Sequence, residues 1–251
     1  MTTFNLTVSP DFSPDHIAGW YVFNTWLQRK LGCRVHLELY DDFPSQRQAI
    51  GEDKIDLIFA NPYDASMLVR EKGFVALATP QGKRDEVIIA SAIESPIEHV
   101  EDLKPGARVV VTQDPDVNLI GMIMLEPADL NRNNIVLSHA ATYVLVSKHL
   151  LMGRADAGFF LKEAYDDLSQ VIRKSLRVLV TSQISVVRHV LLAGPRFAEH
   201  KDALRDLLLT MPEDKEHHGQ GVLDSLGLSG WEPQTDEDTE FMIDLMDTLI
   251  T

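Results

Sequence analysis

The chain changes its hydrophobic period repeatedly from that of a helix to that of a strand, and this alternation limits it to an α/β fold. Within residues 17–31 apolar side chains recur at helical spacing, and Gly32 stands where such a helix would end. Residues 35–39 then alternate apolar and polar side chains, as a strand does. Residues 55–60 are almost continuously apolar, which is typical of a strand covered on both faces. The pattern predicts βαβ units and mostly parallel sheets flanked by helices.

The order of the predicted elements divides the chain into two lobes. Its 251 residues are enough for two, and apolar strands at 87–92 and 186–193 predict two crossings between them. We therefore expect a two-lobed fold in which residues 1–84 and 187–251 form lobe one, residues 85–186 form lobe two, and two segments form a hinge. The expected helices cover residues 17–31, 44–50, 65–72, 95–102, 119–125, 140–152, 198–211 and 239–249.

The charge balance argues against a nucleic-acid partner. Lys and Arg total 23 against 38 Asp and Glu, a formal net charge of −15 that repels nucleic acid and anionic membranes. The longest apolar runs fall short of the ~20 residues that a membrane helix needs, so no membrane insertion is expected. Cys33 is the only cysteine, which excludes an intrachain disulfide.

The first 15 residues lack the basic and apolar regions of a secretory signal. As written, the sequence predicts a cytoplasmic protein, or a periplasmic one if a leader was removed. It contains no phosphate-binding loop, no nucleophile elbow, no His-Glu-x-x-His and no paired cysteines. We expect no catalytic residue, no cofactor and no metal ion, and a binding protein is favoured over an enzyme.

Several local patterns occur in an order that is informative as a set. They are Asp56-Leu57-Ile58-Phe59-Ala60-Asn61-Pro62, Asp102-Leu103-Lys104-Pro105-Gly106, Asp114-Pro115, Ser138-His139, Gly153-Arg154-Ala155-Asp156-Ala157-Gly158, and the stretch from Gly219 to Gly227. In this order the chain resembles, over nearly its whole length, the phosphonate/phosphite substrate-binding proteins of ABC transporters. The resemblance implies a type 2 periplasmic binding protein fold that binds a small molecule in the cleft between its lobes. An ABC permease or a sensor kinase would then respond to closure of the hinge.

The resemblance also implies where the ligand is bound, and there this sequence departs from the family. In the family, backbone N–H groups and a run of hydroxyl side chains hold the ligand oxyanion at a helix start after the Asp-Pro loop. The corresponding positions here are Val117, Asn118 and Leu119, of which only Asn118 has a polar side chain. His139 is a family contact residue that this chain retains.

On lobe one the resemblance points to further altered positions. Phe43 stands where the family often has tyrosine, and Asp64 where it usually has serine, although Asp64 also fits as the cap of the predicted helix at 65–72. Arg188 falls near an acidic contact of some relatives. These two charges predict a ligand less anionic than a phosphonate, with a cationic group near Asp64 and an acidic group near Arg188. The predicted ligand-binding residues are Phe43, Asn61, Tyr63, Asp64, Asn118, His139 and Arg188.

Two alternatives remain open at the level of sequence. Some cytoplasmic proteins of this bilobed fold are enzymes, so the chain could be a menaquinone-pathway dehydratase-like enzyme that acts on a small organic acid. The apolar residues Val117 and Leu119 also permit a vestigial pocket in a protein that only contacts other proteins. The fold does not choose between these functions.

Overall fold

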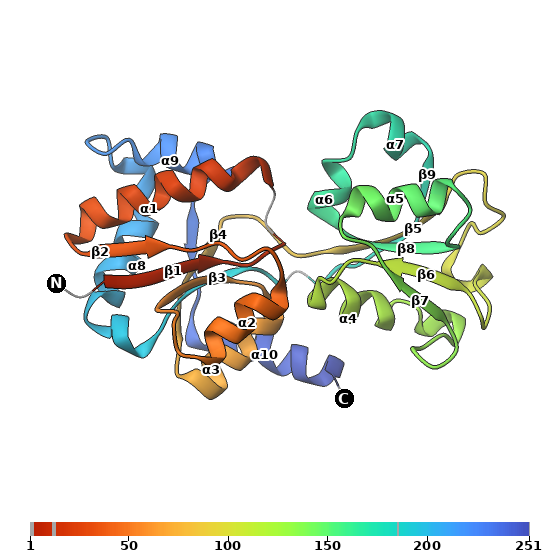
Figure 1. Ribbon diagram of the computed structural model, residues 1–251, viewed down its shortest axis with the longest axis horizontal. Helices are drawn as coiled ribbons and strands as arrows, with labels where there is room; N and C mark the ends of the chain where they lie inside the picture. Colours follow the sequence, from red (N-terminus) through yellow and green to blue (C-terminus); the bar gives the residue numbers. More distant parts are fainter. Residues whose placement is uncertain (1–2, 12–13, 185, 251) are drawn as a thin grey trace. The chain divides into compact units, whose positions relative to one another are not determined.

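The chain forms two compact units (Figure 1). The computed structural model describes residues 3–11, 14–184 and 186–250. Unit 1 is built on the residues up to Arg84 and on Arg188–Met246, and unit 2 on Asp85–Val187 and on the residues from Asp247 onward. The chain leaves unit 1 after Arg84 and returns to it at Arg188.

Unit 1 contains a six-stranded mixed sheet with the order β11-β4-β10-β3-β1-β2. Its strands are β1 (Thr3–Val8), β2 (Arg34–Leu37), β3 (Leu57–Ala60), β4 (Val75–Pro80), β10 (Val190–Ala193) and β11 (Trp231–Pro233). β1 runs parallel to β2 and β3, whereas β10 is antiparallel to β3 and β4, and β11 is antiparallel to β4. The carboxyl ends of β1 and β3 therefore lie at the same edge of the sheet as the start of β10.

Helices cover both faces of this sheet (Figure 1). One face packs against α1 (Ile17–Leu31), α8 (Lys201–Leu209) and α9 (Gly219–Leu226), and the other against α2 (Phe43–Gly51), α3 (Pro62–Lys72) and α10 (Asp236–Ile250). β3 is apolar throughout because both of its faces are buried. Leu57 and Phe59 belong to the core on the α1 side of the sheet, and Ile58 and Ala60 to the core on the α2 side. On the first face Trp20 packs against Phe59 with ring centroids 5.0 Å apart.

Unit 2 contains a five-stranded mixed sheet with the order β7-β6-β8-β5-β9. Its elements are β5 (Val87–Ala92), β6 (Arg108–Val111), α4 (Pro115–Ile123), β7 (Val136–His139), α5 (Tyr143–Leu151), β8 (Ala157–Leu161), α6 (Lys162–Asp166), α7 (Gln170–Lys174) and β9 (Leu176–Thr181). β6 is parallel to β7 and β8, and β5 is antiparallel to β8 and β9. Val146 of α5 and Phe160 of β8 belong to the same core cluster. The neighbouring residue of β8, Phe159, has its ring against Gly121 of α4.

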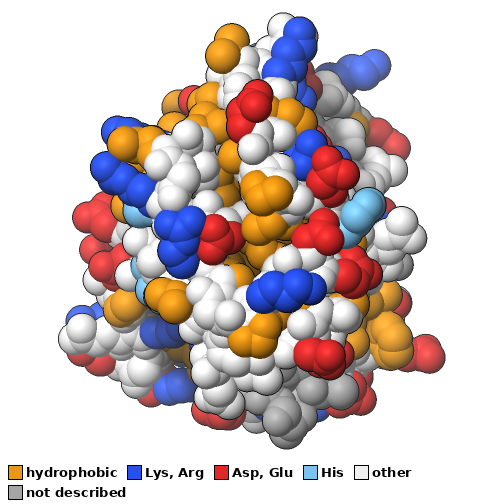
Figure 2. All heavy atoms as spheres, turned by 90° about the vertical axis from the view of Figure 1, so that its right-hand side faces the viewer, with side chains coloured by type: hydrophobic (Ala, Val, Ile, Leu, Met, Phe, Trp, Pro, Cys, Tyr) orange, Lys and Arg blue, Asp and Glu red, His pale blue; other side chains and the backbone are white. Residues whose placement is uncertain are grey.

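Short 3₁₀ helices occupy several connections. They span Pro14–His16, Val100–Asp102, Glu126–Ala128, Pro195–His200 and Met211–Glu213. None of the helices within the described part of the chain has the length and hydropathy of a membrane-spanning segment. On the face of the molecule in Figure 2, cationic and anionic side chains lie next to one another with hydrophobic side chains scattered between them, as on an ordinary solvated surface.

The α/β class with two helix-flanked sheets is confirmed, and in each sheet most strands run in the same direction, as predicted. Both sheets are nevertheless mixed, because β10 and β11 in unit 1 and β5 in unit 2 run antiparallel to the strands beside which they lie. The hydrophobic period identifies a strand without giving its direction, which depends on pairing with strands that are distant in the sequence.

Some element boundaries also differ from the prediction. α4 begins at Pro115 rather than at residue 119, because proline fits the first helical turn and Asp114 caps it by accepting from the Val117 N–H. The helix expected at 95–102 is only the 3₁₀ turn Val100–Asp102. The elements α6, α7, α9 and β11 were not predicted.

Candidate functional site

In unit 1 the ends of β1 and β3 bring polar groups together around Asn61. Asn61 is fully buried and caps α3 by accepting from the Asp64 N–H at 2.8 Å. Its side-chain amide donates to Ser9 Oγ at 3.1 Å and to Asp64 Oδ2 at 3.0 Å. Asn61 therefore ties the end of β1 to the start of α3. The prediction that Asp64 caps this helix is wrong, because the helix begins earlier, at Pro62, with Asn61 as its cap.

Asp64 is the acceptor of a two-point ion pair with Arg47 of α2. Arg47 Nε lies 2.6 Å from Oδ1 and Nη2 lies 3.3 Å from Oδ2, while the Asp64 side chain is only 2% exposed. The guanidinium also lies over two predicted site residues, with its Cζ 5.4 Å from the Phe43 ring centroid and 4.9 Å from that of Tyr63. The structure thus brings Phe43, Tyr63 and Asp64 together around an arginine that was not predicted.

Arg47 Nη1 forms no hydrogen bond with the residues that the structure describes. Asp64 accepts from Nε and Nη2, and the Phe43 and Tyr63 rings lie beside the guanidinium, so its position is set by contacts within the protein. A fixed guanidinium with donors to spare is an anion-binding group.

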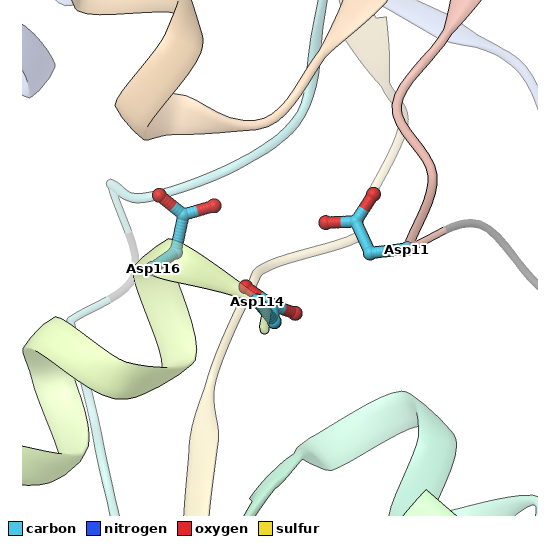
Figure 3. A group of neighbouring side chains, drawn as sticks. All are labelled: Asp11, Asp114 and Asp116. Carbon is cyan, nitrogen blue, oxygen red and sulfur yellow. The ribbon is translucent and has the colours of Figure 1, made fainter. Parts of the chain in front are cut away.

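His189 and Asp11 form a second buried pair at this edge of unit 1. His189 Nε2 lies 3.2 and 3.1 Å from the two Asp11 carboxylate oxygens, and its ring stacks on Phe59 at 5.2 Å. Asp11 follows β1 (Figure 3), and its side chain is 3% exposed. Burial raises the pKa of Asp11, but the charge of His189 and hydrogen bonds from His189 and Ser9 outweigh this, so its pKa is lowered.

Arg188 precedes β10 and pairs with Glu232, which also lies 3.3 Å from Arg84 Nη1. Both charged residues of the predicted site, Asp64 and Arg188, thus have ion-pair partners within the protein. Neither needs a ligand to compensate its charge, which removes the reason for expecting a cationic ligand group near Asp64.

In unit 2 the predicted residues Asn118 and His139 converge on one backbone carbonyl. Asn118 Nδ2 donates to Thr112 O at 3.0 Å, and His139 Nδ1 lies 3.4 Å from the same oxygen. Parallel pairing of β6 and β7 explains this, because Val111 stands opposite His139 and Asn118 lies in the first turns of the helix that follows β6. Asn118 Oδ1 is buried and has no hydrogen-bond partner among the described residues.

The start of α4 carries two buried carboxylates (Figure 3). Asp114 accepts from the Val117 N–H at 3.3 Å and from Tyr143 Oη at 2.8 Å, and Asp116 lies in the first helical turn. The helix start where the resemblance places the ligand oxyanion is thus capped by the chain's own carboxylate. Asp116 adds a second carboxylate to the same helical turn.

With this geometry known, comparison with other proteins identifies the family. The family described as "ABC transporter, phosphonate, periplasmic substrate-binding protein" matches residues 6–239. The chain belongs to this family. A member of this family of periplasmic ABC substrate-binding proteins is expected to have a small-molecule ligand and a permease partner. Membership of the family supports the interpretation as a binding protein and not the enzyme alternative. No protein of curated function matches the sequence significantly.

Solved structures resemble this substrate-binding protein in fold. A Xanthomonas citri protein bound to chloride is 15% identical with a TM-score of 0.82, covering 99% of this chain and 98% of that one. PhnD1 of Prochlorococcus marinus in complex with methylphosphonate is 13% identical with a TM-score of 0.80, covering 99% and 98%. The periplasmic aliphatic sulphonate binding protein SsuA of Escherichia coli is 15% identical with a TM-score of 0.67, covering 98% and 87%.

Sequence reasoning missed several residues of this ABC substrate-binding protein. Arg47 could have been suspected, since it lies one helical turn after Phe43 and faces the same way. Three of the pairs join segments that are distant in the sequence, so no local sequence pattern could predict them: Arg47–Asp64, His189–Asp11 and Tyr143–Asp114.

Proposed function

We propose that this substrate-binding protein binds a small monoanionic organic acid, a sulfonate or a carboxylate, and delivers it to an ABC permease. The observation that carries the proposal is the Arg47 guanidinium, which is fixed by Asp64 and two aromatic rings and has Nη1 unused among the described residues. Because Arg47 is already held in place, binding an anion costs little side-chain entropy.

The preference for a single negative charge follows from the charges near Arg47. The Asp64 carboxylate neutralises the guanidinium, so the pair holds a monoanion through directed hydrogen bonds and has no net positive charge left to balance the second charge of a dianion. The absence of hydroxyl residues at 117–119 supports the same conclusion, since a tetrahedral dianion needs many donors.

The similar structures support an anionic ligand as a class. Their names mention methylphosphonate, aliphatic sulphonate and chloride. Among these chemistries, the neutralised arginine of this chain favours the sulfonate. Asn61, Asn118, His139 and Arg188 remain predicted contacts, and a sensor kinase in place of the permease remains the alternative partner.

The test compares ligands of similar size and different charge by calorimetry at pH 8.5. We expect 1-propanesulfonate and butyrate to bind more tightly than the dianion of propylphosphonate. Tighter binding of propylphosphonate would overturn the proposed preference for a monoanion.

Variants then assign the anion to Arg47. Arg47→Lys keeps the positive charge but loses the planar guanidinium with its fixed N–H donors, so the affinity for propanesulfonate should fall about tenfold or more. The double variant Arg47→Gln/Asp64→Asn removes both charges and should abolish binding. Arg70→Gln, an exposed arginine on α3, is the matched control and should bind normally. Unchanged binding in both Arg47 variants would show that another group holds the anion.

A further inference from the structure

Unit 1 contains a pocket of about 180 Å³ at the edge of its sheet opposite Asn61. Asn61 follows the end of β3, whereas Asp56 in the pocket wall immediately precedes the start of the same strand. Gly194 follows β10 and donates its N–H to Asp56 O at 2.8 Å, and Pro195 and Arg196 complete this side of the pocket. The pocket is therefore separate from the unit 1 site described above.

The inner surface of the pocket is apolar. Ile50 of α2, Ile55 and Phe74 line it, and each is less than 10% exposed. All three belong to the core between the sheet and α2, α3 and α10, so their positions are fixed by packing. This surface suits a short hydrocarbon chain.

The charged groups around the pocket differ in how fully their charges are paired and hydrogen-bonded within the protein. Lys72 Nζ lies 2.7 Å from Asp53 Oδ1, so these two charges compensate each other. Asp56 is 1% exposed, and its Oδ2 accepts the Asn5 N–H at 2.8 Å. Asp56 Oδ1 is buried without a hydrogen bond among the described residues. Arg196 Nη1 lies 3.3 Å away, outside hydrogen-bond geometry, on a side chain that is 54% exposed.

Within the described part of the chain, Asp56 Oδ1 is compensated only by the ion pair with Arg196 and accepts no hydrogen bond, so a ligand that donates one to it improves on this arrangement. The Arg196 side chain is exposed enough to move into solvent and leave Oδ1 to a smaller cation. A cavity of about 150 Å³ can bind benzene, so a pocket of about 180 Å³ has room for one molecule with four or five carbon atoms.

We propose that this pocket is a second ligand site that binds a free small alkylammonium compound. The ammonium group donates to Asp56 Oδ1, and the alkyl chain packs on Ile50, Ile55 and Phe74. This site does not depend on the anion-binding function, because its residues and its edge of the sheet are different.

The first experiment uses the full chain with isotope-labelled isoleucine methyl groups, observed by NMR. Titration with n-butylammonium is expected to give saturable shifts at Ile50 and Ile55. The neutral n-butanol and the anionic butyrate are similar in size to n-butylammonium, and neither should give a saturable shift of these two signals. Equal or stronger response to butanol or butyrate would overturn the proposal, as would no response to butylammonium. Because Ile50 lies three positions after Arg47 on α2, the butyrate titration is repeated in Arg47→Gln/Asp64→Asn, which removes any signal from butyrate at Arg47.

Variants assign the ammonium group to its acceptor. Asp56→Asn retains an acceptor for the Asn5 N–H and should weaken butylammonium binding at least about tenfold, since a charged hydrogen bond is lost. Asp224→Asn makes the same charge change at an exposed position of α9 and should bind like the wild type. Arg196→Ala removes the competing cation and should bind more tightly. Wild-type affinity in Asp56→Asn would refute the assignment; if that variant does not fold, weaker binding by Arg196→Ala refutes it instead.

Discussion

Arg47 and Asp64, which are 17 positions apart in the sequence, form a two-point ion pair that joins α2 to α3. Nε and Nη2 each approach a different carboxylate oxygen, at 2.6 and 3.3 Å. The pair fixes the guanidinium at the end of the unit 1 sheet. It also makes an acidic position that seemed suited to a cationic ligand part of the proposed anion-binding group.

This ion pair leads to a stability prediction. Arg47→Gln leaves the buried Asp64 carboxylate without its cation and should lower the free energy of unfolding by about 2 kcal/mol or more. Arg47→Gln/Asp64→Asn should lose less than the sum of the two single variants, with a coupling of about 1 kcal/mol or more in urea unfolding. Additive losses would contradict a direct interaction between the two side chains.

Asp214 provides a prediction about pH. Burial raises its pKa, but hydrogen bonds from Trp26 Nε1, Lys30 and His217 N outweigh burial and lower the pKa to about 2. The folded pKa is thus below the ordinary value of 3.8. The resulting stabilisation is present above pH 3.8 and is lost as the pH falls from there through about 2.

Carboxyl ¹³C NMR titration measures this pKa directly. Trp26→Phe removes one donor and should move the midpoint of Asp214 toward higher pH. Asp214→Asn should flatten the acid part of the stability curve. A midpoint that does not move in Trp26→Phe would mean that the indole N–H does not hold the carboxylate.

The packing of α1 on α9 depends on a glycine. A Cβ at Gly19 would lie 2.1 Å from Ser225 O, which is backbone and cannot move aside easily. Gly19→Ala should therefore destabilise the protein by about 1–3 kcal/mol in thermal or urea unfolding. Gly51→Ala on α2 is the control, because nothing lies within 4 Å of its Cβ and helix propensity favours alanine. Equal effects of the two substitutions would contradict this close approach.

Tyr143 stabilises the start of α4 through Asp114. Its hydroxyl donates to Asp114 Oδ2 at 2.8 Å, while the other carboxylate oxygen caps the helix. Tyr143→Phe keeps the ring stacked on Phe160 and loses this hydrogen bond, so the free energy of unfolding should fall by about 1.5 kcal/mol. Tyr21→Phe, at a 54% exposed position, should have no effect. Hydrogen exchange should show faster opening of α4 in Tyr143→Phe alone.

The sequence alone predicted the class of fold, most of its elements and the family. α1 and β5 have the bounds that the periodicity gives, because a helix or strand that buries one face carries its own hydrophobic pattern. The resemblance placed Asn118 and His139 in the ligand site, and the structure brings both to Thr112 O; their contact with a ligand stays a prediction.

Only the tertiary structure decided which strands run against the others and which residue pairs with Asp64. β10 pairs antiparallel with strands more than 100 residues away, and Asp64 meets Arg47 rather than a ligand cation. A hydrophobic pattern records what a segment buries, whereas the partner of a charged side chain depends on which segments the fold brings together. For that reason the sequence placed Asp64 among the predicted ligand-binding residues without indicating that Arg47 is its partner.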